Sequence, residues 1–294
     1  MRKLTYCPVC EQTKFRPLLS CEDHTVSHET FSIEECVTCG FVLTNPQPDE
    51  AELPRYYTSD AYISHSDKSQ NLVDRIYKVS RTFAIQWKYR VINNKSLTHP
   101  KSILDYGCGT GSFLAYCEQK GMQAAGVEPS PAARTIAGKQ TSAKLTADLS
   151  QINETFDAIT LWHVLEHVSA LNETLEMLKG RLHQNGTMFI AVPNHQSSDA
   201  KKYNSHWAAY DVPRHLWHFS KATMKKLLEK HQLKLNDIVP MKLDAYYVSL
   251  LSEKYRGRTN GIANIGKAIV EGWRSNSAAG NTGEYSSLIY IVRK

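Results

Sequence analysis

Cysteines are the first residues in this 294-residue chain whose spacing suggests chemistry, and five of the seven lie within the first 39 residues. Cys7 and Cys10 form one C-x2-C pair, and Cys36 and Cys39 form another. An odd total argues against a simple disulfide framework, and in a reducing compartment two such pairs suit a tetrahedral zinc–thiolate site. We expect a structural zinc ion on these four sulfurs, because four protein ligands leave no open position for a substrate.

A rival ligand set consists of Cys7, Cys10, Cys21 and either His24 or His28, since zinc also accepts imidazole. The set of two matched pairs is favoured because it explains more of the pattern, and Cys21 is then a spare thiol. A redox C-x-x-C motif lacks the βαβ context that it needs here.

A glycine run, Gly107, Gly109 and Gly111, follows the apolar segment 102–106. Glycines are needed where a turn is tight and a ligand must approach the backbone closely. A dinucleotide fingerprint would have its third glycine at position 112, where this chain has Ser112. The loop alone therefore does not identify its ligand.

Two acids near this loop narrow the choice of ligand. Asp105 would repel a pyrophosphate, but it can hold the ammonium group of an amino acid. Glu128 lies 23 residues later, where a carboxylate accepts two ribose hydroxyls. A ligand with a nucleoside at one end and a zwitterion at the other satisfies both acids, and S-adenosylmethionine is such a ligand.

An alternating pattern of strand-like and helix-like segments from residue 101 onwards predicts the scaffold, a parallel sheet with helices on its faces. The expected strands are 102–106, 123–127, 144–146, 156–162, 187–192, 233–239 and 287–292. One predicted helix carries a stripe of leucines and is closed by Asn185-Gly186; the stripe is Leu171, Leu175, Leu178 and Leu182.

Three regions are expected along the chain: a cysteine module at 1–48, a helical lid or linker at 49–99, and a catalytic domain at 100–294. The prolines of Asn45-Pro46-Gln47-Pro48 set the first boundary. A long amphipathic helix is predicted in the second region from the spacing of Leu72, Ile76, Val79, Phe83, Trp87 and Val91.

Four segments resemble, in order, the motifs of class I S-adenosylmethionine-dependent methyltransferases across residues 101–194. They are Ile-Leu-Asp-Tyr-Gly-Cys-Gly-Thr-Gly, Gly-Val-Glu-Pro-Ser, Phe-Asp-Ala-Ile-Thr-Leu-Trp-His-Val-Leu-Glu-His-Val and Gly-Thr-Met-Phe-Ile-Ala-Val-Pro-Asn. The cysteine module and the segment 213–220 further resemble a bacterial subgroup with an N-terminal zinc ribbon.

This resemblance implies an α/β fold, a Rossmann-like seven-stranded sheet with helices on both faces, preceded by a small zinc ribbon. By position, Asp105, Gly107 and Gly109 would meet the methionine part of the cofactor, and Glu128 its ribose. Further along the chain it assigns Asp148 and Leu149 to the adenine and places His163 at the start of the loop under the cofactor.

Histidines supply the candidate catalytic residues. His163, Glu166 and His167 match the H-x-x-E-H pattern of inverted zinc peptidases, but that pattern needs both histidines on a helix, and His163 directly follows a predicted strand. His215 and His218 lie about 25 residues beyond the fifth strand, where open α/β sheets bind ligands, so one of them is expected to act as a base on the acceptor. Aromatic side chains from Trp207 to Phe219 are expected to line a pocket with Tyr56, Tyr57 and Tyr62.

Composition and charge bear on the acceptor. With 41% hydrophobic and 22% charged residues the chain is an ordinary globular protein, and no apolar run is long enough to span a bilayer, so a cytoplasmic location is expected. Residues 201–294 carry 16 basic and 7 acidic side chains, although Lys221, Lys225, Lys226 and Lys230 fit the solvated face of one helix.

We expect methyl transfer to a small organic acceptor such as a sugar or another anionic metabolite, C- or O-directed, drawn in by Arg214 and the basic C-terminal third. A ribosomal-RNA methyltransferase is the alternative, because a zinc ribbon beside this fold also resembles that group. It is less favoured because residues 1–100 carry 12 basic and 12 acidic side chains. A non-catalytic scaffold is the third class, and the intact loop glycines and acids argue against it.

Overall fold

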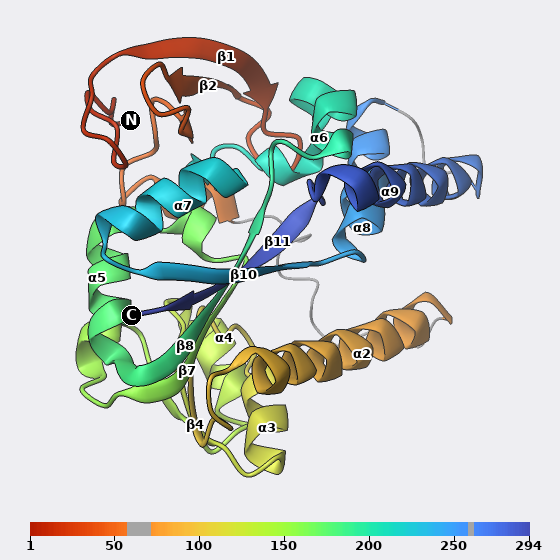
Figure 1. Cartoon of the computed structure of the whole chain (residues 1–294). Coiled ribbons are helices and arrows are strands. Elements are labelled where there is room, and N and C mark those ends of the chain that lie inside the picture. The colour runs from red at the N-terminus through yellow and green to blue at the C-terminus, as the bar shows by residue number, and fades with distance from the viewer. Residues whose placement is uncertain (58–71, 258–261) are drawn as a thin grey trace.

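The computed structural model describes residues 1–57, 72–257 and 262–294, and it is built around one seven-stranded sheet (Figure 1). The strand order is β10-β11-β8-β7-β4-β5-β6. The strands are β4 (Ser102–Tyr106), β5 (Gln123–Val127), β6 (Lys144–Thr146), β7 (Phe156–Trp162), β8 (Leu182–Pro193), β10 (Lys234–Pro240) and β11 (Ser287–Arg293). Strands β4 to β8 pair in parallel, whereas β11 pairs antiparallel with both β8 and β10. The predicted α/β fold with seven strands is confirmed.

Side chains along each strand point alternately to the two faces of the sheet, and an apolar core forms on each face. Leu104 and Ile159 pack with α5 (Leu171–Arg181) and α7 (Lys221–Lys230), while Ile103 and Ala158 pack with α2 (Leu72–Lys95) and α3 (Ser112–Gln119). Helices therefore cover both faces, as expected for a Rossmann-like sheet. The remaining α-helices of the described chain are α4 (Pro131–Ala137), α6 (Ser198–Tyr203), α8 (Asp244–Tyr255) and α9 (Ile262–Thr282).

The strand order reverses at β4, since β5 lies on one side of it and β7 on the other. Such a switch point opens a crevice beyond the carboxyl ends of the strands, where open α/β sheets bind ligands. The turn from β4 into α3 holds the glycine run and lies at this crevice.

A second, four-stranded sheet joins the cysteine module to the segment that follows β8. It consists of β1 (Phe15–Glu22), β2 (Thr30–Cys36), β3 (Val42–Thr44) and β9 (Trp217–His218), in that order. The cysteine module supplies three of these strands, and β9 comes from the segment after β8. The backbone of Val42 pairs with His218 and that of Leu43 with Trp217. Domain boundaries at residues 48 and 99 stay a prediction.

Two helix predictions need correction. Helix α5 ends at Arg181 and β8 begins directly at Leu182, so Asn185-Gly186 lies inside a strand and is not a C-cap. In α2, Val91 is buried but Phe83 is 63% exposed, because the buried contacts of this helix with α3 and the sheet gather near its C-terminal end. Of the other stripe residues, the side chains of Leu72, Ile76 and Val79 lie outside the described part, as does Tyr62.

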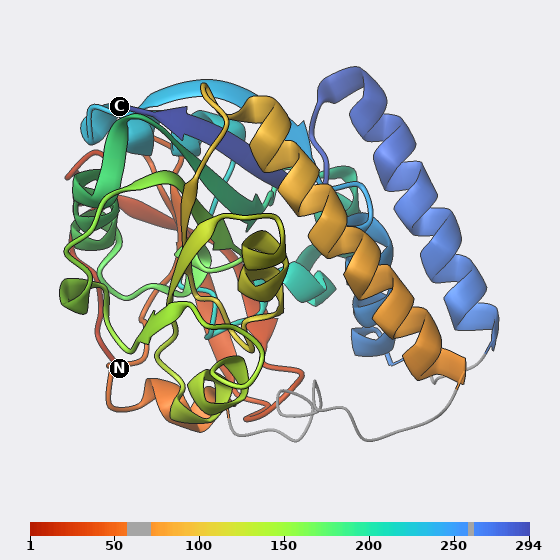
Figure 2. The ribbon, with the colours of Figure 1, turned by 90° about the horizontal axis from the view of Figure 1, so that it is seen from below.

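Helices α2 and α9 extend from the same end of the sheet (Figures 1 and 2). Among the described helices, none combines the length and the apolar character that a membrane span requires.

The four lysines predicted on the solvated face of α7 do lie on its outer side, with Lys225, Lys226 and Lys230 exposed, but three of the four also bind other parts of the chain. Lys226 donates to the carbonyl of Cys39 at 3.0 Å, and Lys230 donates to the carbonyl of Pro8 at 2.9 Å. Lys221 pairs with Glu284 at 2.9 Å. These ammonium groups hold the cysteine module and the C-terminal strand region onto α7, so they add less free positive charge than the sequence count indicates.

Candidate functional site

The glycine loop adopts a conformation that side chains other than glycine rarely tolerate. Gly107, Gly109 and Gly111 have φ values of 79°, 54° and 77°. A Cβ on Gly107 would lie 2.4 Å from a methyl of Val164, and one on Gly111 would lie 2.9 Å from the Cβ of Ala137. A Cβ on Gly109 would meet nothing within 4 Å. The first and third glycines therefore allow close packing, and the middle one leaves open space against which a ligand can lie.

Glu128 follows β5 and turns its carboxylate onto this loop. Its Oε2 accepts a hydrogen bond from the Gly109 amide at 2.9 Å, and its Oε1 accepts one from the Ser130 amide at 2.9 Å. The side chain is half-buried. Glu128 thus contacts the glycine loop directly, and its carboxylate lies next to the open space at Gly109.

Asp105 lies at the end of β4 and is only 2% exposed. The Thr160 hydroxyl, on the neighbouring strand β7, donates to its Oδ1 at 2.6 Å. Burial raises the pKa of Asp105 to about 7, although the hydrogen bond from Thr160 and the nearby ammonium of Lys88 oppose the rise. A carboxyl group with this environment gains from a cationic partner, because a second positive charge would offset its desolvation.

The remaining predicted cofactor residues lie after the two flanking strands. Asp148 is exposed and accepts from the Ser150 amide at 2.7 Å, which lowers its pKa, whereas Leu149 is buried. His163 directly follows β7 with φ 58°. Because β7, β4, β5 and β6 are neighbouring parallel strands, the residues after them meet at one edge of the sheet. The structure therefore brings together the predicted cofactor residues.

His163 is held between two carboxylates. Its Nε2 lies 2.9 Å from Asp244 Oδ2, and its Nδ1 lies 3.3 Å from Glu166 Oε1. Burial opposes charge on the ring, but Asp244 and Glu166 raise the pKa of His163 to about 10. The ring is therefore an imidazolium at neutral pH. No sequence signal links Asp244 to His163, because the two residues lie 81 positions apart.

The two candidate bases, His215 and His218, are both buried. His218 lies in β9, and its Nε2 is 3.0 Å from the Thr44 hydroxyl. That hydroxyl donates its hydrogen to the His215 carbonyl at 2.8 Å, so His218 Nε2 must be the donor in their contact. Burial and the neighbouring His215 hold the pKa of His218 well below its usual range. His218 is bound within the second sheet, and its catalytic role stays a prediction.

His215 precedes β9, and its Nδ1 lies 2.8 Å from the Ala209 carbonyl. Its ring meets that of His167 edge to face, with centroids 4.5 Å apart. Tyr57 reaches the same place, since its hydroxyl lies 3.1 Å from His167 Nδ1. Tyr57 therefore lies near His215 through His167, and the predicted shared pocket stays a prediction. Tyr56 and Trp207, by contrast, are buried in a packed apolar cluster, where Trp207 lines a small cavity with Tyr210 and Arg214.

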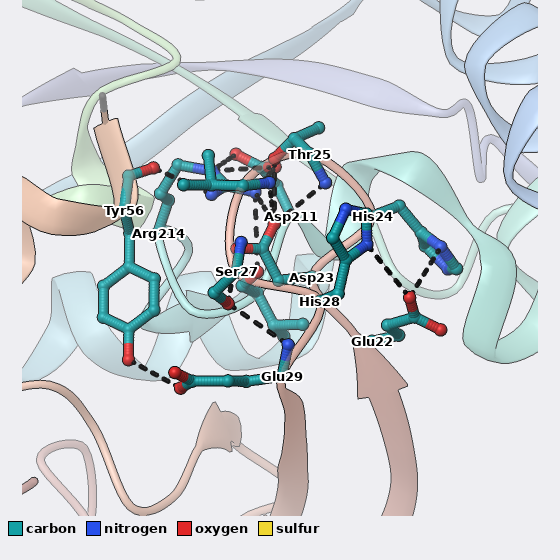
Figure 3. A network of polar contacts seen from close by, with 12 residues as sticks. Glu22, Asp23, His24, Thr25, Ser27, His28, Glu29, Tyr56, Asp211 and Arg214 are labelled. Atoms are coloured by element: carbon teal, nitrogen blue, oxygen red, sulfur yellow. Dashed lines mark hydrogen bonds and ion pairs between the residues drawn. The ribbon is translucent and has the colours of Figure 1, made fainter. Parts of the chain in front are cut away.

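Arg214 was expected to attract an anionic acceptor, and the structure corrects this. Its side chain is 2% exposed and donates to Asp23 at 2.8 Å, to Asp211 at 2.7 Å and to the Tyr56 carbonyl at 2.9 Å (Figure 3). Burial opposes the charge of Asp23, but Arg214 and the Ser27 amide lower the pKa of its carboxyl. Arg214 therefore ties the hairpin β1–β2 to the segment before β9 and has no charge to offer a substrate.

The four paired cysteines converge. Cys7 Sγ lies 3.5 Å from Cys39 Sγ, and Cys10 Sγ lies 3.5 Å from Cys36 Sγ. All four sulfurs lie within 4.8 Å of one another. Zinc bonded to four sulfurs at about 2.3 Å requires neighbouring sulfurs about 3.8 Å apart, so the donor set fits that ion.

The rival ligand set does not come together in the same way. Cys21 is buried apart from the four sulfurs, and burial raises the pKa of its thiol to about 12. His24 stacks on Tyr255 with ring centroids 4.5 Å apart, and His28 faces Glu22.

The comparisons with known proteins agree with this geometry. The chain matches the family model described as "Methyltransferase domain" over residues 81–237. The mitochondrial ubiquinone biosynthesis O-methyltransferase of Schizosaccharomyces pombe is 27% identical over 129 residues, which cover 40% of this chain and 47% of that protein. The match thus spans about half the length of this curated relative.

Similar solved structures show the same fold at low identity. The plantazolicin methyltransferase BpumL, in complex with a pentazolic desmethylPZN analog and SAH, has a TM-score of 0.52 and 16% identity, covering 82% of this chain and 94% of that chain. The mycolic acid cyclopropane synthase CmaA1, complexed with SAH and CTAB, has a TM-score of 0.50 and 14% identity, covering 71% and 84% of the two chains.

Proposed function

The chain belongs to the methyltransferase-domain family, and on this premise we propose that it is an enzyme that transfers a methyl group from S-adenosylmethionine to a small organic acceptor. The observation that carries the proposal is the glycine loop at the strand-order switch, with Asp105 and Glu128 on either side of its open middle position. The relative from Schizosaccharomyces pombe, named as an O-methyltransferase of ubiquinone biosynthesis, supports a small acceptor.

The residues at this edge of the sheet fit the cofactor. Asp105 would hold its ammonium group, the backbone at Gly107, Gly109 and Gly111 would lie against its methionine part, and Glu128 would accept the ribose hydroxyls. Asp148 and Leu149 would contact the edge and face of the adenine. The open space at Gly109 supports this arrangement, since a side chain there would fill the place of the ligand.

When bound, S-adenosylmethionine supplies a methyl group on a sulfonium, which is already activated for in-line displacement. The protein therefore has to align the acceptor, exclude water and hold a proton that the acceptor loses. The loop His163–Val168 lies against the glycine loop through Val164, and His215 reaches it from the segment before β9. We place the acceptor beside this loop.

Of the two predicted bases, His215 fits this place better than His218. The Ala209 carbonyl can only accept, so His215 Nδ1 carries a hydrogen and its Nε2 keeps a lone pair when the ring is neutral. His218 Nε2, in contrast, is used as a donor to Thr44. A nucleotide-linked sugar or another anionic metabolite, methylated on carbon or oxygen, remains our proposed class of acceptor.

We further propose that Cys7, Cys10, Cys36 and Cys39 bind a structural zinc ion. The support is the convergence of four sulfurs at tetrahedral spacing. With four protein ligands the ion has no position for substrate, so its role would be to fix the cysteine module.

The test of the cofactor site is calorimetry with S-adenosylhomocysteine. We expect micromolar affinity for the wild type, about −8 kcal/mol. Glu128→Ala should cost about 1.5–3 kcal/mol, or roughly 10- to 150-fold in affinity, because it removes charge-assisted hydrogen bonds to the ribose. Glu154→Ala is the matched control, since Glu154 is exposed and its described contacts are those with Lys144 and the Asn153 amide, away from the glycine loop. Equal affinity of the wild type and Glu128→Ala would refute the ribose role.

A further inference from the structure

A cluster of metal-ligating side chains lies beside the glycine loop, apart from the four cysteines. Glu166 and His167 belong to the 3-10 helix η3 (Leu165–His167), and His215 precedes β9. One ligand atom from each lies within 4.8 Å of those of the other two. We propose that Glu166, His167 and His215 form a second metal site, which binds a divalent transition-metal cation.

Both imidazoles have a backbone carbonyl beside Nδ1. His167 Nδ1 lies 3.1 Å from the Arg214 carbonyl, and His215 Nδ1 lies 2.8 Å from the Ala209 carbonyl. A carbonyl oxygen only accepts, so His215 Nδ1 carries a hydrogen and its neutral ring has the lone pair on Nε2. The carbonyl favours the same tautomer for His167, whose Nδ1 also lies 3.1 Å from the Tyr57 hydroxyl. Metal-ligating histidines usually donate their other ring N–H to a carbonyl or carboxylate in this way.

Glu166 provides an independent sign of a missing partner. Its side chain is fully buried, and its Oε1 is used by His163 at 3.3 Å. Its Oε2 is buried and has no hydrogen-bond partner among the described residues. An unpartnered carboxylate oxygen is costly in a protein interior, and a cation between it and the two imidazoles would offset that cost.

The two segments that carry the ligands are fixed to each other. The Leu216 amide donates to the Glu166 carbonyl at 2.8 Å, and the Thr44 hydroxyl donates to the His215 carbonyl at 2.8 Å. Strand β3 of the cysteine module thus supports the segment that carries His215. A preformed donor set is what a binding site needs, because ordering the ligands then costs little on binding.

The donor chemistry selects the class of ion. Two imidazoles and one carboxylate suit zinc and other first-row divalent cations better than calcium or magnesium, which prefer oxygen ligands. Asp211 adds negative charge nearby, with its Oδ2 3.9 Å from His215 Nε2. Three protein ligands leave a coordination position open, unlike the four-cysteine site.

The location of the cluster indicates a role for the open coordination position of the ion. Val164, two residues before Glu166, packs against Gly107, so the ion would lie close to the cofactor loop. There it could bind an oxygen of the acceptor, orient it and lower the pKa of its proton. The ion would then take the place of His215 as the group that promotes proton loss, because it would occupy the Nε2 lone pair of that histidine. This last step rests on the proposed methyltransferase function, whereas binding of the ion does not.

The test counts metal ions in the purified full-length protein. After removal of all metal and reloading with zinc, elemental analysis should find one ion at the cysteines and a second at the cluster. Glu166→Gln and His215→Gln should each lose the second ion and keep the first. Cys36→Ser should do the reverse. His195→Gln is the matched control, because His195 is also buried, and its Nε2 has no hydrogen-bond partner in the part of the chain that the structure describes. It lies outside the cluster, so this variant should keep both ions.

A second measurement needs no variant. Cobalt bound to the cysteines shows intense thiolate charge-transfer absorption. Cobalt at the cluster should add only weaker bands, because the cluster has no thiolate ligand. A wild-type protein that binds metal only at the cysteines would overturn the proposal, as would full retention of the second ion by Glu166→Gln and His215→Gln.

Calorimetry with S-adenosylhomocysteine on the same samples separates the two proposals. Cofactor binding without a second ion refutes the metal site alone, and a second ion without cofactor binding refutes the function alone.

Discussion

Asp105 and Glu128 follow neighbouring strands at the same ligand site, but their surroundings differ. Glu128 is half-buried and bound by two backbone amides, whereas Asp105 is buried with one hydroxyl donor, and its pKa is raised to about 7. Near neutral pH, Asp105 of the free protein is therefore partly protonated and neutral. A cationic ligand binds the carboxylate form, so ligand binding should draw a proton off this residue.

Cofactor affinity should consequently rise with pH. Between pH 6 and pH 8 the ionised fraction of Asp105 increases about tenfold for a pKa near 7, and S-adenosylhomocysteine should bind about tenfold more tightly at the higher pH. Calorimetry at several pH values checks this. Asp105→Asn is the control, because it should bind more weakly with the pH dependence removed, while titration of the ligand's own amine affects both proteins equally. Identical pH profiles for the two proteins would contradict the role of Asp105.

Sequence motifs identified the site residues that directly follow single strands. They did not identify the residues that contact these site residues and shift their pKa. The glycine run, Asp105 and Glu128 form local patterns tied to one turn. Thr160 and Asp244 act on these sites only because β7 pairs with β4 and α8 packs near His163. A hydroxyl and a carboxylate at such separations leave no periodic or motif signal, so only the fold could reveal them.

Strand β9 is short, yet it couples the cysteine module to the acceptor side of the site. Its Trp217 and His218 complete the sheet next to β3, and the Thr44 amide and the Gln47 side chain both donate to the Leu216 carbonyl. Two residues cannot show strand periodicity, which is why this strand was not predicted. The long strands of the central sheet carry clear apolar runs, and they were predicted well.

Loss of the proposed zinc ion should therefore loosen the acceptor side of the site more than it loosens the cofactor loop. Cys36→Ser should lose the ion and speed hydrogen exchange of the amides at 215–218 by about tenfold or more, because β3 no longer holds them. Exchange in the glycine loop should change little, since that loop is fixed by β4, β5 and α3. Mass spectrometry of exchanged peptides measures both regions.

Cys21→Ser provides the matched control for that experiment. Cys21 is buried in the same module but lies apart from the four sulfurs, so its variant should keep the ion. Zinc loss in Cys21→Ser, or full zinc in Cys36→Ser, would count against the four-cysteine site.

At the scale of the whole molecule, several basic side chains of the C-terminal third are paired within the protein. Arg214 is buried between Asp23 and Asp211, Lys221 pairs with Glu284, and Lys230 pairs with Glu11. Charge that is already paired and partly buried releases few counterions on meeting a polyanion. A count of basic residues in the sequence could not show this, because every partner but Asp211 and Glu284 comes from the N-terminal part of the chain.

The protein should therefore bind RNA weakly and without specificity. Fluorescence anisotropy with a labelled RNA hairpin should give dissociation constants of about 10⁻⁴–10⁻⁶ M at physiological salt, the range of non-specific binding. Methyl transfer to a panel of small acceptors should change little between 50 and 200 mM salt, two conditions between which phosphate-driven binding falls by orders of magnitude. Cofactor-dependent methylation of the hairpin with a steep salt dependence would instead support the RNA alternative. A small acceptor is favoured because several of the basic groups that could bind a phosphate backbone are already paired within the protein.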